Sequence, residues 1–121
     1  MTPTAPSIAI KDVAAVISTA RFEEAKTWYA RLLGREPDLE PVPGVAEWQL
    51  TATAWLQVIT DSSGAGRSAV RFGVDDLDAT VDRLRDGGVD VTEPQVIADM
   101  VAVIDIADPD GNEVSFVAEL A

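Results

Sequence analysis

The order of apolar and polar residues predicts a chain in which strands alternate with two helices. Runs of apolar, often β-branched residues, or strict alternation of apolar and polar residues, predict strands. These strands cover residues 13–17, 45–50, 54–60, 68–74, 101–106 and 113–118. Proline interrupts two further segments, 37–44 and 89–97, and the first of them can be at best an edge strand.

Both helices are predicted by apolar stripes with a spacing of three or four residues. The stripes consist of Phe22, Ala25, Tyr29 and Leu32 or Leu33 in the first helix, and of Leu77, Val81 and Leu84 in the second. Gly34 stands where a left-handed C-cap is expected. Asp75 and Asp76 are placed to cap the second helix at its positive end, and the glycines at 87–88 end it.

The segment 108–112, Asp-Pro-Asp-Gly-Asn, predicts the turn of a hairpin between the last two strands. Proline fixes φ at the second turn position, aspartate bonds to its own backbone, and glycine accepts a positive φ. The chain is therefore expected to close a sheet at this turn.

The two halves of the chain repeat one order of elements. An offset of 55 residues aligns Phe22 with Leu77 and Tyr29 with Leu84, so each half contains a strand, a helix and three strands. Residues 61–66 form a linker rich in glycine and serine, with a first module at about 12–60 and a second at about 67–120. At 121 residues, we expect a single α+β domain, 1–121.

The strands of the first module carry two tryptophans. If the loop between strands 45–50 and 54–60 has an even number of residues, Trp48, Trp55 and Gln57 are expected on one face. Two indoles on one face form a stacking surface for a planar ligand, or a core packed against a helix, and the sequence leaves both interpretations open.

The composition excludes several kinds of chemistry. The chain has no cysteine and no histidine, so it has no disulfide, thiolate nucleophile, imidazole ligand or imidazole base. Its net charge is -12, of which residues 1–60 carry -2 and residues 61–121 carry -10. Such a charge repels phosphate backbones and anionic membranes, so we expect neither a nucleic-acid nor a membrane partner.

The N-terminus and the absence of cysteine favour a cytoplasmic protein. Residues 1–7 contain proline and serine and no basic run before an apolar core, so a signal peptide is not expected. No apolar run approaches the length needed to cross a bilayer.

The chain contains three motifs whose order and spacing resemble those of the vicinal oxygen chelate superfamily. This superfamily includes glyoxalase I, extradiol dioxygenases and bleomycin-resistance proteins. The motifs are residues 25–34, 74–78 and 108–112. The resemblance extends from about residue 12 to residue 119. It implies two βαβββ modules that form a curled mixed sheet around a cavity, usually in a homodimer.

Enzymes of this superfamily hold a metal ion with histidine and glutamate at four positions. The resemblance places these positions at Ala14, Gln57, Ala69 and Ser115. A methyl group has no lone pair, an amide and a hydroxyl are weak donors, and a catalytic site needs about three protein ligands. The resemblance therefore implies no metal and no cofactor here, and neither metal-dependent glyoxalase nor dioxygenase activity.

The chain is closest in character to the bleomycin-resistance branch, which uses the fold without metal as a dimer that sequesters its drug. By that analogy, a small organic molecule lies against Trp48 and Trp55, with Gln57 and Ser115 as hydrogen-bonding groups.

Arg71 is expected on the inward face of its strand. A buried guanidinium needs a carboxylate, so it either pairs with Asp105 or Glu113 or binds an anionic group of the ligand. An enzyme remains an alternative, namely a metal-independent lyase or isomerase with Glu113 and Asp105 as general acid and base. A third possibility is a structural or regulatory dimer whose cavity is filled by its own side chains.

Overall fold

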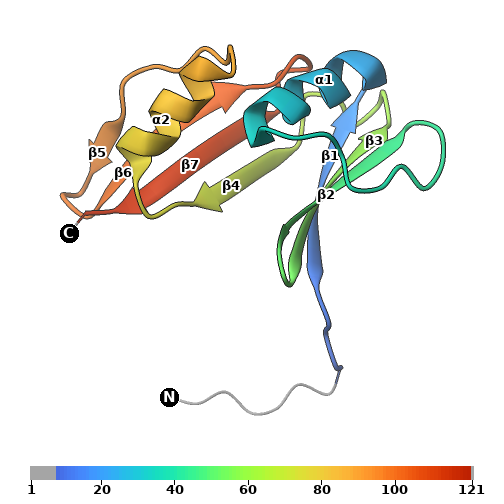
Figure 1. Cartoon of the computed structure of the whole chain (residues 1–121), viewed down its shortest axis with the longest axis horizontal. Coiled ribbons are helices and arrows are strands. Elements are labelled where there is room, and N and C mark those ends of the chain that lie inside the picture. The colour runs from blue at the N-terminus through green and yellow to red at the C-terminus, as the bar shows by residue number, and fades with distance from the viewer. Residues whose placement is uncertain (1–7, 121) are drawn as a thin grey trace.

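Two units of similar construction lie side by side, each with one helix on one face of a small sheet (Figure 1). The computed structural model describes residues 8–120. The first unit contains β1 (Val13–Thr19), α1 (Phe22–Leu33), β2 (Val45–Thr51) and β3 (Ala54–Thr60). The second contains β4 (Ala69–Gly73), α2 (Leu77–Asp86), β5 (Gln95–Ile97), β6 (Val101–Ala107) and β7 (Glu113–Glu119).

The two sheets repeat one topology. In the first sheet, with the order β1-β3-β2, β1 is parallel to β3, and β2 is antiparallel to β3. In the second, with the order β4-β7-β6-β5, β4 is parallel to β7, and β6 is antiparallel to β7. This repeat confirms the predicted α+β architecture.

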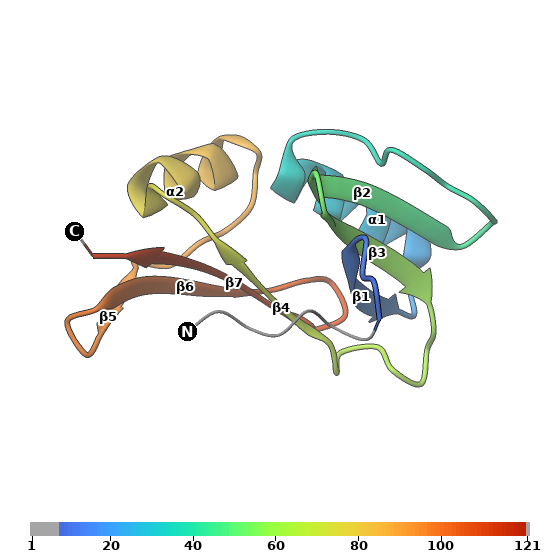
Figure 2. The ribbon, with the colours of Figure 1, turned by 90° about the horizontal axis from the view of Figure 1, so that it is seen from below.

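The two modules form the expected mixed strands, divided into two sheets that within residues 8–120 do not close around a cavity. Figure 2 shows the second sheet nearly edge-on below α2 while the first is seen broadly in front of α1, so the sheets face different directions. The proline-rich segment 37–44 contributes only an isolated bridge from Leu39 to Glu47, as suits an edge. Among the described residues, the first sheet therefore has three strands and the second has four.

The helix ends follow the sequence signals. Gly34 adopts φ of 76°, and its N–H donates to the carbonyl of Ala30. Asp76 caps α2 by accepting a hydrogen bond from the N–H of Ala79 at 3.0 Å. No helix in residues 8–120 is both long enough and apolar enough to span a membrane.

The core lies between each helix and the sheet that it covers. The helix side buries large apolar side chains, among them Tyr29, Trp48, Leu56, Val81, Ile104 and Phe116. On the sheets, buried positions alternate with positions on the opposite face, which no helix of residues 8–120 covers. We call these two uncovered surfaces the open faces. Of the residues predicted to bind a ligand, they carry Trp55, Gln57, Arg71 and Ser115.

A β-bulge in β2 decides which of its side chains face the helix and which face the open side of the first sheet. The loop between β2 and β3, residues 52–53, has two residues, as the even-loop condition requires. The pairing nevertheless shifts between Gln49 and Thr51, which leaves Leu50 as an extra residue. One extra residue inverts the alternation of side chains along the rest of β2, including Trp48.

The prediction that Trp48, Trp55 and Gln57 share one face is therefore wrong. Trp48 pairs with Leu56 on the helix side, is 0% exposed, and donates its indole N–H to the carbonyl of Arg35 at 3.0 Å. Trp55 and Gln57 point the other way. Trp48 thus belongs to the core, which was the second of the two interpretations.

The turn at 108–112 fastens the second unit to the first. The buried Asp108 accepts a hydrogen bond from the Tyr29 hydroxyl of α1 at 2.7 Å. Asp110 accepts from the Thr19 hydroxyl at 2.5 Å and from the Ala20 N–H at 2.9 Å. Asn112, which is 0% exposed, donates its amide to the carbonyl of Ser18 at 2.9 Å. We call residues 108–112 the clasp.

Hydrogen bonds also order the segment expected to be a flexible linker, 61–66. Asp61 accepts hydrogen bonds from the hydroxyls of Ser63 at 2.8 Å and Ser18 at 3.2 Å. These two bonds lower the pKa of Asp61 below its ordinary value.

Candidate functional site

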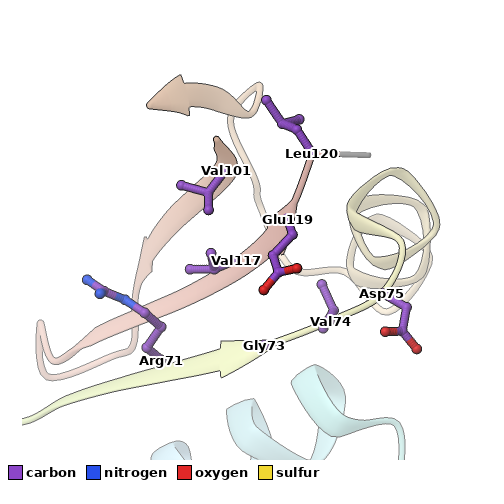
Figure 3. Close-up of a pocket in the computed structure, with 8 residues that line it drawn as sticks. All are labelled: Arg71, Gly73, Val74, Asp75, Val101, Val117, Glu119 and Leu120. Carbon is purple, nitrogen blue, oxygen red and sulfur yellow. The ribbon is translucent and has the colours of Figure 1, made fainter. Parts of the chain in front are cut away.

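A large cavity lies on the open face of the second sheet, at the end of β4 (Figure 3). Its volume is about 810 Å³. It is lined by Arg71, Gly73, Val74, Asp75, Val101, Val117, Glu119 and Leu120. Apolar side chains and a small number of charged groups are the usual lining of a small-molecule site.

Gly73 deepens this cavity. A Cβ built at Gly73 meets no atom within 4 Å, and the residue does not have a positive φ. Neither crowding within residues 8–120 nor a left-handed backbone therefore accounts for glycine here. A glycine in a strand often marks a close approach of a ligand or another backbone.

Arg71 is the only predicted ligand-binding residue that lines this cavity. Its side chain is exposed, and within residues 8–120 no carboxylate lies within ion-pair distance of its guanidinium. The alternative in which Arg71 pairs structurally with Asp105 or Glu113 is thus not what the described chain shows. The guanidinium keeps its donors for another acceptor.

Ser115 lies directly across from Arg71 on β7 but is engaged elsewhere. It is 2% exposed, and its hydroxyl donates to Asp105 Oδ1 at 2.5 Å. Glu113 Oε1 lies 3.4 Å from the same hydroxyl. The two carboxylates proposed as acid and base therefore flank one serine on the open face, as the alternation of β7 predicts.

Trp55 and Gln57 line a different and smaller cavity of about 270 Å³, on the open face of the first sheet. The Gln57 amide donates to Glu47 Oε2 at 2.7 Å. Since the two cavities share no lining residue, one chain does not bring Trp55 and Gln57 together with Arg71.

The four positions where the superfamily holds a metal do not fit a metal ion. Ala14 and Ala69 offer only methyl groups. The Gln57 amide and the Ser115 hydroxyl are both bonded to carboxylates. In the part of the chain that the structure describes, no group of three or more carboxylates is arranged to hold a metal ion.

Sequence reasoning missed most of the cavity lining. Val101, Val117 and Glu119 share the open face with Arg71 because β6 and β7 pair Val101 with Glu119 and Val103 with Val117. The alternation along β7 would have placed Val117 and Glu119 on the face of Ser115. For Gly73, the available signal was an unexplained glycine at the end of a strand.

Comparison with known proteins agrees with this architecture. Residues 12–116 match the family model described as Glyoxalase/Bleomycin resistance protein/Dioxygenase superfamily. A glyoxalase/bleomycin resistance protein from Catenulispora acidiphila has 30% identity over 91% of this chain and 98% of its own, with a TM-score of 0.84. Comparison with curated proteins gave no match.

Two more distant structures share the fold. TnmS3, an antibiotic binding protein from a Streptomyces species, has a TM-score of 0.74 and 20% identity over 96% of this chain and 100% of its own. A lactoylglutathione lyase from Agrobacterium tumefaciens has a TM-score of 0.71 and 16% identity over 95% of this chain and 96% of its own. On the match over residues 12–116, this chain belongs to the glyoxalase/bleomycin resistance protein/dioxygenase superfamily.

Proposed function

We propose that this protein binds a small organic molecule without a metal ion, and that its role is to sequester the molecule, as a drug-binding protein does. The observation that carries the proposal is the cavity on the second sheet. Its volume of about 810 Å³ lies within the range of roughly 300–1,000 Å³ that is usual for small-molecule sites. The antibiotic-binding neighbour TnmS3 supports the drug-binding role by analogy of fold.

The donor chemistry supports binding without metal. Two of the four superfamily metal positions are alanine, and the other two are neutral groups already bonded to carboxylates. A binding site built from Arg71, valines and a glycine needs no cation to hold its ligand.

We further propose that the functional form is a homodimer. Large apolar side chains stay exposed on the open faces, on the N-terminal segment and in the turn between β5 and β6, including Ile8, Ile10, Val16, Ile97 and Met100. The two cavities lie, like some of these side chains, on the separate open faces of one chain. A cytoplasmic location remains a prediction from the sequence.

The proposal is tested by a substitution that places a large side chain in the cavity. Gly73→Phe adds a benzyl group at a position where the Cβ meets no atom within 4 Å, so the substitution introduces no clash at its Cβ. Ala69→Phe is the matched control, because Ala69 is an exposed residue on the same face of β4 outside the cavity lining. A panel of aromatic and antibiotic compounds is titrated by calorimetry, with and without EDTA.

We expect at least one compound to bind the original protein and Ala69→Phe equally, with EDTA making no difference, and to bind Gly73→Phe at least tenfold more weakly. Equal binding to both variants would show that the cavity is not the site. Stoichiometric uptake of zinc, nickel or manganese would contradict the metal-free part of the proposal. Sedimentation equilibrium tests the dimer.

A metal-independent lyase or isomerase is the second candidate, because Asp105 and Glu113 flank the Ser115 hydroxyl. Two carboxylates on either side of one hydroxyl can act as an acid and base pair. Exchange of the α-proton of small hydroxyketones for deuterium tests this activity by NMR. Activity that survives EDTA and is lost in Glu113→Gln would favour the enzyme over the binding protein.

A further inference from the structure

The positive and negative groups of the large cavity lie at its opposite ends. Figure 3 shows the Arg71 side chain on one side and the carboxylates of Asp75 and Glu119 on the other, with Val117 between them. The floor beside Val117 is the bare backbone of Gly73. The cavity therefore runs from a cationic end, over an apolar floor, to an anionic end.

The cationic end is available to a ligand. Arg71 has five N–H donors and makes no ion pair within residues 8–120. Asp105 is bonded to the Ser115 hydroxyl, which leaves the guanidinium free to take a carboxylate, sulfonate or phenolate in its planar fork.

The anionic end sets the orientation. An anionic group beside Glu119 or Asp75 would be repelled, whereas a hydroxyl or amino group there would donate a hydrogen bond. Asp75 is four positions after Arg71 in the chain, which corresponds to at most roughly 13 Å at the rise of an extended strand. A ligand that contacts both ends is therefore elongated.

We propose that the cavity selects an elongated, amphipathic organic anion. Its acidic group lies on Arg71, its flat apolar body lies over Gly73 and Val117, and a hydrogen-bond donor faces Glu119. This inference rests on the proposed binding function and specifies the chemical class of its ligand.

Two probes that share one ring system test the inference. 1-Anilinonaphthalene-8-sulfonate carries an anionic sulfonate, and N-phenyl-1-naphthylamine is the same molecule without it. Both become fluorescent in apolar sites, so each is titrated by fluorescence. Only the binding that Gly73→Phe removes and Ala69→Phe retains is assigned to the cavity.

Arg71→Met removes the charge and keeps a long apolar side chain. Arg67→Met is the matched control, because Arg67 is exposed, lies outside the cavity lining and changes the net charge equally. We expect Arg71→Met to weaken the sulfonate probe about tenfold, the loss typical of a hydrogen bond to a charged group, and the neutral probe less than twofold. Arg67→Met should change neither probe more than twofold. Melting temperatures of all variants verify that they are folded.

The outcomes separate this inference from the proposed function. If Gly73→Phe removes binding of both probes but Arg71→Met affects them equally or affects neither, the cavity binds ligands and the anion selectivity is wrong. If neither probe shows any binding that depends on Gly73, both the inference and the proposed function are overturned.

Discussion

Asp108 in the clasp offers the sharpest test of how the two units are held together. Its Oδ1 accepts hydrogen bonds from the N–H groups of Asp110 and Asn112, both at 2.9 Å. Its Oδ2 accepts from the Tyr29 hydroxyl at 2.7 Å and the Asn112 amide at 2.8 Å. Asp108→Asn keeps the shape but replaces one acceptor by an NH2 group.

Either orientation of that amide places the NH2 group against two donors. Only the Tyr29 hydroxyl can turn and accept instead, so at least one hydrogen bond to a buried carboxylate is lost. Each such bond contributes about 1.5–3 kcal/mol. We therefore expect the free energy of unfolding to fall by roughly 2–5 kcal/mol, a large share of the 5–15 kcal/mol typical of a domain.

Equilibrium unfolding in urea at pH 7, followed by tryptophan fluorescence, measures the change. Asp82→Asn is the control, because Asp82 is an exposed residue on α2 and the substitution removes the same charge. It should change the free energy of unfolding by no more than about 0.5 kcal/mol. A loss below about 1 kcal/mol in Asp108→Asn would refute the clasp as a main stabilising contact.

Three further results are expected. Burial, and then the hydrogen bond to Asp108, raise the pKa of Tyr29, the single tyrosine, above its ordinary value. Unfolded tyrosine ionises near pH 10 and folded Tyr29 does not, so the free energy of unfolding should fall above pH 10 by up to about 1.4 kcal/mol per pH unit. Tyr29→Phe should lack this component, and absorbance at 295 nm should show no tyrosinate before unfolding. Because Trp48 is buried and Trp55 is partly exposed, Trp55→Phe should reduce fluorescence quenching by acrylamide, whereas Trp48→Phe should not; the reverse would contradict the bulge. Trp48→Ala should cost about 3–5 kcal/mol by urea unfolding, as large core truncations do.

Local chemistry explains which predictions the structure confirms. The stripe of α1 and its cap at Gly34 depend on residues within a few turns of one another, and both are found as predicted. The same holds for the N-cap at Asp76 and for the turn at 108–112, whose conformation is set by proline, aspartate and glycine.

The features that the sequence did not predict depend on which face of a sheet a side chain occupies and on contacts between segments distant in the chain. Trp48 lies on the face opposite to the predicted one because the pairing of β2 with β3 contains one extra residue, Leu50. No local preference of the sequence marks this extra residue. The partners of the clasp in the first unit are 79 to 94 residues away from it in the chain, for example Tyr29 from Asp108 and Ser18 from Asn112. Periodicity within one strand carries no information about such contacts.

The sequence by itself determined the order of the elements, the repeated unit, the likeness to the superfamily, and the lack of histidine, cysteine and strong metal donors at the four positions. Only the tertiary structure decided that the indoles of Trp48 and Trp55 lie on opposite faces and that the clasp joins the units. It also decided that Arg71, which makes no ion pair within residues 8–120, lies at one end of a cavity floored by Gly73. The reason is physical. Helix caps, turns and apolar stripes arise from neighbouring residues, whereas a cavity is the space left between strands whose register is fixed far away in the chain.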